Sequence, residues 1–96
     1  MGDQSLPQAI ERVRRDIDLV RSGNFNCQSV LTHLRWLELF FPGFGFRRRE
    51  LAFAFCQAKD VLHNLVKGNL DRKKARPQLV GVLEKIVSLC EQQTSF

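Results

Sequence analysis

Apolar residues recur every three or four positions along nearly the whole chain, and this spacing limits the fold to packed helices. The first stripe consists of Leu6, Ile10, Val13, Ile17 and Val20. Such spacing places side chains on one face of an α-helix, whereas half-buried strands alternate at every second residue. The charged residues in between are expected to face water: Glu11, Arg12, Arg14, Arg15, Asp16 and Asp18. Ser5 and Gln8 form a capping-box pattern and Gly23 is a typical C-terminal residue, so we predict a first helix between them.

The next two helices are bounded by similar signals. Asn24 or Asn26 can cap a second helix, and the sequence PGFG at 42–45 ends it because proline cannot continue a helix. Its apolar positions are Val30, Leu31, Leu34, Leu37 and Phe41, with Trp36 and Phe40 widening the apolar face. A third helix is predicted from about Arg47 to Lys67, because Gly68 follows as a C-terminal glycine.

The last part of the chain predicts a basic connection and then one more helix. The sequence NLDRKKAR at 69–76 is polar, and Pro77 suits the first turn of the helix that follows. The apolar residues of this helix are Leu79, Val80, Val82, Leu83, Ile86, Val87 and Leu89. We expect it to end at Cys90, with residues 91–96 frayed. The prediction is therefore a single all-α domain, 1–96, built as a bundle or hairpin of about four helices.

The small size of the chain favours a homodimer. A chain of 96 residues buries only about two-thirds of the surface that it exposes when unfolded, so its core alone is modest. Eight Phe and one Trp supply apolar area that a partner can cover. We expect the aromatic residues near the end of the second helix to lie in the core or in a dimer interface, with base stacking as the alternative. They are Trp36, Phe40, Phe41, Phe44 and Phe46.

The cysteines and histidines do not match a metal or disulfide pattern. Cys27, Cys56 and Cys90 are odd in number and widely spaced, and no C-x-x-C pair occurs. His33 and His63 lie at no metal-ligand spacing. We therefore expect free thiols in a reducing, cytoplasmic setting, and neither a metal nor another cofactor.

The sequence also predicts neither catalysis nor membrane insertion. PGFGF lacks the glycine spacing and the Lys-Ser/Thr step of a phosphate-binding loop. Cys56 and His63 lie seven residues apart, too far for a nucleophile and its base. The N-terminal residues contain no apolar core of signal-peptide length, and no run of about 20 apolar residues occurs. We expect a protein that is not an enzyme and does not enter a membrane.

Positive charge is concentrated in one segment. The chain carries 15 basic and 10 acidic residues, a net charge of +5. Residues 1–46 are neutral, residues 47–76 carry a net charge of +6, and residues 77–96 carry −1. Such an excess favours an anionic partner, such as nucleic acid or a membrane surface. The third helix and the connection after it are therefore the candidate binding segment.

A helical wheel divides the third helix into a core side and a basic row. The core side consists of Leu51, Ala54, Phe55, Ala58, Leu62 and Leu65. The row consists of Arg48, Ala52, Cys56, Lys59, His63 and Lys67. Small residues between spaced cations suit a nucleic-acid groove with phosphates on both sides, and a merely solvated face is the alternative. We predict that the binding residues are Arg47, Arg48, Arg49, Ala52, Cys56, Lys59, His63, Lys67, Arg72, Lys73 and Lys74.

Several short motifs in this region resemble the small RNA-silencing suppressor proteins of nodaviruses. They are Arg48-Arg49-Glu50-Leu51, Ala54-Phe55-Cys56 with Lys59, and Arg76-Pro77-Gln78-Leu79-Val80-Gly81-Val82-Leu83. The resemblance covers roughly 40 of the 96 residues. Where the family has an arginine about ten residues after the cysteine, this chain has Val66 followed by Lys67.

The resemblance implies a viral protein that binds double-stranded RNA in the host cytoplasm. It implies an antiparallel helical homodimer whose flat face lies along A-form RNA without reading bases. It also implies a function: shielding long duplex RNA and small interfering RNA from Dicer. On this basis Arg48, Cys56 and Lys59 are expected to contact RNA, and a direct contact with Dicer itself is left open.

Two other functions stay open at the level of the sequence. The first is a helical protein–protein adaptor whose basic row docks an acidic partner. The second is binding to an anionic membrane surface, which we disfavour because the bundle core must use the apolar face beside the row. We do not expect a membrane partner.

Overall fold

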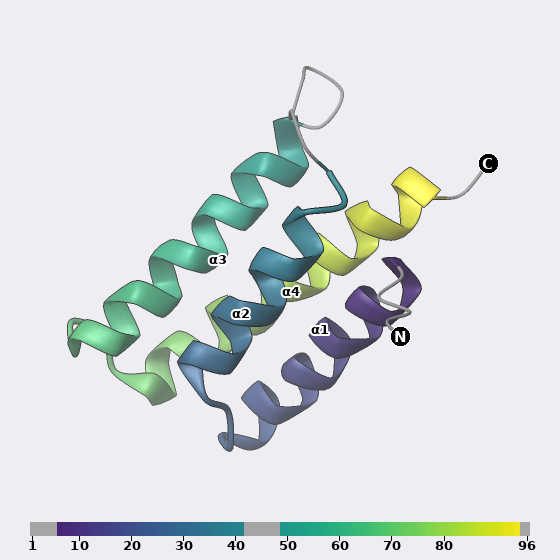
Figure 1. Ribbon diagram of the computed structural model, residues 1–96. Coiled ribbons are helices and arrows are strands. Elements are labelled where there is room, and N and C mark those ends of the chain that lie inside the picture. The colour runs from purple at the N-terminus through teal and green to yellow at the C-terminus, as the bar shows by residue number, and fades with distance from the viewer. Residues whose placement is uncertain (1–5, 42–48, 95–96) are drawn as a thin grey trace.

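The computed structural model describes residues 6–41 and 49–94, which form four α-helices that run alternately up and down (Figure 1). The helices are α1 (Leu6–Ser22), α2 (Cys27–Glu38), α3 (Arg49–Lys67) and α4 (Arg72–Thr94). Both α1 and α3 pack against α2 and against α4, so the four helices enclose one core. The predicted all-α fold is confirmed.

The core consists of the predicted apolar stripes. All six residues that the wheel placed on the core side of α3 are buried. The largest fully buried side chains are Phe55, Leu34, Leu37, Leu51, Leu62, Leu79, Leu83 and Ile86. Each buried side chain of this size stabilises the fold by roughly 1.5–3 kcal/mol relative to its exposed state. The aromatic prediction is confirmed for Phe41, which is buried, and for Trp36 and Phe40, which pack half-buried against the core; Phe44 and Phe46 lie outside the described residues.

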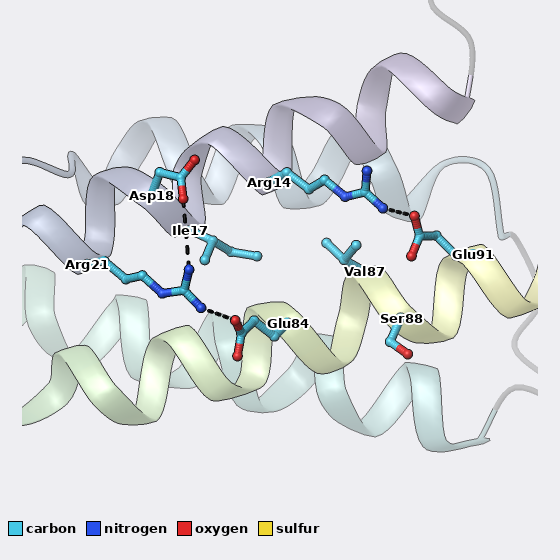
Figure 2. A pocket seen from close by; sticks show the side chains of 8 residues that line it. All are labelled: Arg14, Ile17, Asp18, Arg21, Glu84, Val87, Ser88 and Glu91. Atoms are coloured by element: carbon cyan, nitrogen blue, oxygen red, sulfur yellow. Dashed lines mark hydrogen bonds and ion pairs between the residues drawn. The ribbon is translucent and has the colours of Figure 1, made fainter.

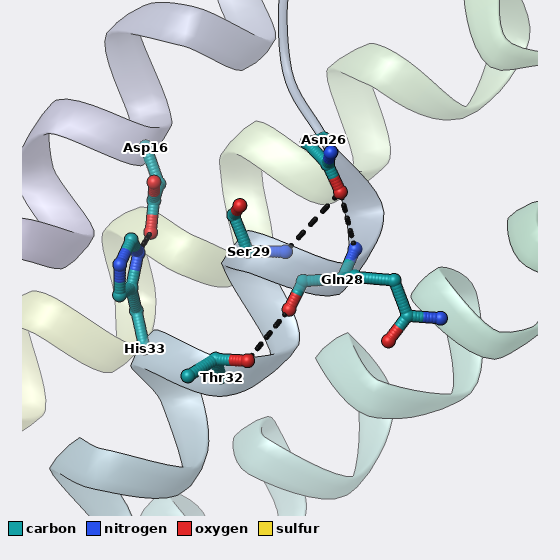
Figure 3. A network of polar contacts seen from close by, with 6 residues as sticks. All are labelled: Asp16, Asn26, Gln28, Ser29, Thr32 and His33. Carbon is teal, nitrogen blue, oxygen red and sulfur yellow. Dashed lines mark hydrogen bonds and ion pairs between the residues drawn. The ribbon is translucent and has the colours of Figure 1, made fainter.

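The helix ends explain how the chain turns between α1 and α2 and between α3 and α4. The side-chain oxygen of Asn26 accepts hydrogen bonds from the backbone N–H groups of Gln28, at 2.9 Å, and Ser29, at 3.3 Å (Figure 3). Asn26, rather than Asn24, therefore caps α2. Gly23 and Gly68 follow α1 and α3 with φ angles of 84° and 81°, a conformation that favours glycine. The predicted signals at Ser5 and 42–45 lie outside the described residues.

The predicted basic connection at 69–76 is wrong, because α4 already begins at Arg72. The side chain of Asp71 accepts a hydrogen bond from the backbone N–H of Lys73 at 3.1 Å, as an N-cap does. Pro77 is therefore inside the helix, where it cannot donate a hydrogen bond to the Lys73 carbonyl. Burial of Ala75 and Leu79 on the same helix offsets that loss. The helix also continues to Thr94, past its predicted end at Cys90.

Asp16 was predicted to face water, and this prediction is wrong. Its side chain is buried between α1 and α2, with the residue only 3% exposed, and Oδ2 lies 2.6 Å from His33 Nδ1 (Figure 3). Burial raises the pKa of the Asp16 carboxyl above its ordinary value of 3.8, although His33 and Arg12 act in the opposite direction. The pair links two helices through a polar contact inside an otherwise apolar interface.

The three cysteines are free thiols in different environments. Cys27 and Cys90 are buried, and Cys56 is exposed on α3. Burial raises the pKa of the Cys90 thiol to about 12, so it remains protonated. Across 6–41 and 49–94, no helix is long and apolar enough to cross a lipid bilayer.

Candidate nucleic-acid interface

The predicted row on α3 follows one side of the helix beside the core. Cys56, His63 and Lys67 are exposed, whereas Ala52 and Lys59 are half-buried. Arg49 is exposed at the first turn of the helix. Arg47 and Arg48 lie outside the described residues.

Lys59 forms an ion pair within the fold. Its Nζ atom lies 2.9 Å and 3.1 Å from the two carboxylate oxygens of Glu38, at the end of α2. The two side chains are only 29% and 23% exposed, respectively. The ion pair therefore joins α3 to α2 and compensates the charge of Lys59. Sequence reasoning missed this pair because its members lie 21 residues apart.

Arg72 is also engaged within the fold. Its Nη2 atom donates a hydrogen bond of 2.6 Å to the carbonyl oxygen of Phe25, and its guanidinium carbon lies 4.0 Å from the centre of the Phe25 ring. Its Nη1 atom lies 3.9 Å from the sulfur of Cys27. The hydrogen bond and the cation–π contact fasten the start of α4 to the connection between α1 and α2.

Three other predicted residues, Lys67, Lys73 and Lys74, form what we call the basic end. They lie where α3 ends and α4 begins (Figure 1). All three are exposed. Within the described part of the chain, none of the three has an acidic partner within 4 Å. Asp71 lies among them, but its side chain caps α4. The basic end therefore carries three uncompensated cations within eight residues of sequence.

A hollow of about 250 Å³ beside the basic end adds Arg76, which the predicted set of binding residues leaves out, and Arg21, which pairs with Glu84 and Asp18. Arg21 of α1 and Arg76 of α4 line it together with Lys73, Pro77 and Val80. Arg76 Nη2 donates a 3.0 Å hydrogen bond to the carbonyl oxygen of Arg21, which orients its guanidinium. The two residues are 55 positions apart, so no local pattern could have joined them.

The long sides of α1 and α4 form a groove of about 340 Å³ whose charges are compensated (Figure 2). Arg14 pairs with Glu91, and Arg21 pairs with Glu84 and, at 3.9 Å, with Asp18. These surface ion pairs contribute little to stability, but they leave this face without a net excess of positive charge. The groove is therefore a weaker site for a polyanion than the basic end.

Phe53 is the most exposed large apolar residue of α3 and lies at the opposite end of the helix from Lys67, beside which Val66 is 50% exposed. Phe53 is 61% exposed, and with Arg49, Glu50, Ala52 and Cys56 it lines a shallow hollow of about 440 Å³. We call these five residues the Phe53 patch. Phe53 is not among the predicted binding residues, although its position outside the core side of the helical wheel is a signal of its exposure.

The described residues contain no group of three or more His, Cys, Asp or Glu side chains that could hold a metal ion. Comparisons of this chain with protein-family models, with curated proteins and with solved structures found no match. The candidate site therefore consists of the basic end, the hollow beside it and the neighbouring exposed residues of α3.

Proposed function

We propose that this protein binds double-stranded RNA without reading its base sequence. The observation that carries the proposal is the basic end, where Lys67, Lys73 and Lys74 lack acidic partners among the residues placed by the structure. Lysine binds a phosphate as a point charge, and a contact with phosphate carries no information about the base sequence. The basic end therefore suits contact with a nucleic-acid backbone. His63 lies one turn before Lys67 on the same side of α3 and extends this surface.

The choice of duplex RNA rests on the resemblance to the nodavirus suppressors. Duplex RNA is recognised mainly through its shape, its phosphates and its 2′-hydroxyl groups, because its deep major groove excludes side chains. In this proposal the protein is a viral suppressor of RNA silencing in the host cytoplasm. It covers long duplex RNA and small interfering RNA and so keeps them from a Dicer-type nuclease.

The proposal includes a homodimer formed through the Phe53 patch. Two α3 helices packed antiparallel about a point between Ala54 and Phe55 would place Arg49 opposite Asp60 of the partner subunit, and the reverse. The two residues lie about 16 Å apart along the helix, on either side of Phe53. This arrangement is self-complementary in charge and in apolar surface, as a twofold interface must be.

A titration with four nucleic acids tests the RNA proposal. Duplex RNA, duplex DNA and both single strands are titrated with the protein at about 50 mM and 200 mM salt, and the bound fraction is measured by mobility shift. We expect the tightest binding to duplex RNA, the same affinity for unrelated RNA sequences, and a steep loss of affinity at higher salt. Equal affinity for all four nucleic acids would contradict the proposed preference.

The Phe53 patch also favours a second function, that of a protein–protein adaptor. An exposed aromatic residue beside Arg49 fits a partner with an apolar side chain and a neighbouring acid. An adaptor would retain all four nucleic acids weakly and without preference. The same titration therefore separates the two functions.

A further inference from the structure

The first turn of α4 has few contacts that the helix itself provides. Ala75 is the one buried residue in the segment 71–76, and it contributes only a methyl group. Its backbone N–H donates a 2.9 Å hydrogen bond to the carbonyl oxygen of Asp71. Pro77 cannot donate to the Lys73 carbonyl, so one hydrogen bond between this turn and the rest of the helix is missing. The helix alone therefore fixes its first turn weakly.

Two arginines hold this turn against the connection between α1 and α2. Arg72 and Arg76 lie four residues apart, so they project from the same side of α4. Arg72 Nη2 donates a 2.6 Å hydrogen bond to the carbonyl oxygen of Phe25, and the guanidinium carbon lies 4.0 Å from the centre of the Phe25 ring. Arg76 Nη2 donates a 3.0 Å hydrogen bond to the carbonyl oxygen of Arg21. Both acceptors are backbone groups, 47 and 55 residues away in sequence.

Gly23 allows Arg76 to approach the end of α1 closely. A Cβ atom at this position would lie only 3.2 Å from Arg76 Nη1, so the guanidinium lies against the bare backbone of the glycine. The Arg21 carbonyl belongs to the last turn of α1, where carbonyl groups have no acceptor role within the helix. Arg76 therefore satisfies a helix end and is itself fixed in orientation by it.

The same turn carries two of the three lysines of the basic end. Lys73 and Lys74 follow Arg72 directly, and both are exposed. Their positions depend on the position of the turn, since they belong to its backbone. Groups that are held in place before a ligand arrives avoid the cost of ordering on binding.

We infer that Arg72 and Arg76 are positioning residues, which hold the first turn of α4 and its two exposed lysines in place for the phosphates of duplex RNA. The ligand rests on the proposed function, whereas the ordering of the turn does not. This role differs from the predicted contact of Arg72 with RNA. Loss of a phosphate contact lowers the slope of log affinity against log salt by about one. Loss of positioning lowers the affinity but keeps the slope, because the same lysines bind the same phosphates once the turn is ordered.

Amide hydrogen exchange of the free protein, followed by NMR, tests the positioning without RNA. Arg72→Met removes the donor and the charge but keeps an unbranched side chain, and Arg72 is exposed, so the variant should fold. A hydrogen bond from a charged group is lost, so we expect the amides of Ala75 and Arg76 to exchange about tenfold faster or more. The amide of Leu83, in the middle of α4, should keep its rate and serves as the reference. Unchanged exchange at Ala75 would overturn the inference.

Phe25→Leu tests the effect on RNA without changing any charge. Phe25 is only 4% exposed, so its ring is not a contact for RNA. Because the cation–π contact with Arg72 is lost, we expect affinity for duplex RNA to fall about threefold or more, with an unchanged salt slope. The matched control is Phe41→Leu, which removes a ring that is 3% exposed at the other end of α2 and should leave RNA affinity unchanged.

The outcomes separate this inference from the proposed function. An equal loss of RNA affinity in Phe25→Leu and Phe41→Leu would attribute the effect to overall stability and overturn the positioning role. A wild-type protein that does not bind duplex RNA would contradict the proposed function. The exchange rates of Arg72→Met would then still decide whether this residue holds the first turn of α4.

Discussion

The two ends of α3 differ in the kind of side chain that they leave exposed to water. At its N-terminal end, Phe53 leaves most of an aromatic side chain in water, beside Ala52 and Cys56. At its C-terminal end, Lys67 begins a group of cations without acidic partners, which continues with Lys73 on α4. The N-terminal end leaves an aromatic side chain largely without contacts, whereas the C-terminal end, where Val66 is also 50% exposed, leaves cations without acidic partners among the described residues.

This difference predicts two interactions that respond differently to salt. Exposed charges are screened within about 8 Å at physiological ionic strength, and phosphate binding by lysine also releases counterions. Burial of apolar surface is not weakened by ordinary salts and is strengthened by sulfate or phosphate. Salt should therefore remove RNA from the basic end while leaving contacts through the Phe53 patch intact.

The largest expected effect is that of removing all three lysines of the basic end. In Lys67→Ala/Lys73→Ala/Lys74→Ala we expect affinity for duplex RNA to fall about 100-fold near physiological salt, because each phosphate contact contributes about fivefold there. The slope of log affinity against log salt should decrease by about three, one for each contact. A mobility-shift titration at several salt concentrations measures both quantities.

The control for this variant is Lys85→Ala, which removes a lysine of α4 that lies 4.0 Å from Glu50, far from the basic end. We expect RNA affinity and salt slope close to those of the wild type. Because Lys85→Ala removes one charge, it is compared with the single variant Lys73→Ala. An equal loss of RNA affinity in the two would show that net charge, rather than the basic end, determines binding.

The next effect concerns the opposite end of α3. If the Phe53 patch holds the dimer, Phe53→Ser should raise the dimer dissociation constant at least about 30-fold, as expected for a central aromatic residue of an interface. The monomer should remain folded, because Phe53 is mostly exposed. Sedimentation equilibrium measures the constant, and circular dichroism checks the fold. Leu19→Ser, at an apolar residue of α1 that is 44% exposed, is the matched control and should not change it.

A charge exchange tests the antiparallel register of that dimer. Asp60→Arg alone would place like charges opposite each other twice and should weaken the dimer, and Arg49→Asp added to it should restore the opposite charges. A double variant that stays as weak as Asp60→Arg would rule out this register, even if Phe53 is in the interface.

Sequence periodicity was sufficient where the outcome depends on one helix. The predicted core side of α3 is buried at all six positions, because burial follows the phase of the helix. Asp16 lies at a position that faces α2, and its partner His33 is 17 residues away, so a pattern of charged letters in α1 could not reveal the pair. The start of α4 was missed because a run of basic residues and Pro77 outweighed the N-cap signal of Asp71.

The candidate site was predictable in composition but not in detail. The charge excess of 47–76 led to the lysines of the basic end. It could not separate them from Lys59 and Arg72, whose partners Glu38 and Phe25 lie 21 and 47 residues away. Which cations are free is thus a property of tertiary packing.

Lys59 is paired with Glu38, whereas Lys67 has no acidic partner among the described residues, so substitution of the two lysines should have different effects. Lys59→Ala leaves Glu38, only 23% exposed, without its partner, and should lower the free energy of unfolding by about 1 kcal/mol. Its effect on RNA affinity should be smaller than that of Lys67→Ala, which in turn should not change stability. Urea unfolding and RNA titration of both variants check the four expectations. A larger loss of RNA affinity in Lys59→Ala would support the sequence-based prediction that this residue contacts RNA.

The smallest expected effect is the pH dependence that Asp16 confers on the packing of α1 against α2. Since burial raises its pKa above 3.8, the folded protein binds the Asp16 proton more tightly than the unfolded chain does. The contribution of Asp16 to stability is therefore fully present below pH 3.8 and declines as pH rises through the pKa of the folded state.

The variant Asp16→Asn tests this dependence, because it keeps the size of the side chain and an oxygen for His33 but cannot ionise. Thermal unfolding of both proteins from about pH 3.5 to 5.5 should show the variant gaining on the wild type as pH rises. The opposite trend would mean that the contact with His33 outweighs burial at this site.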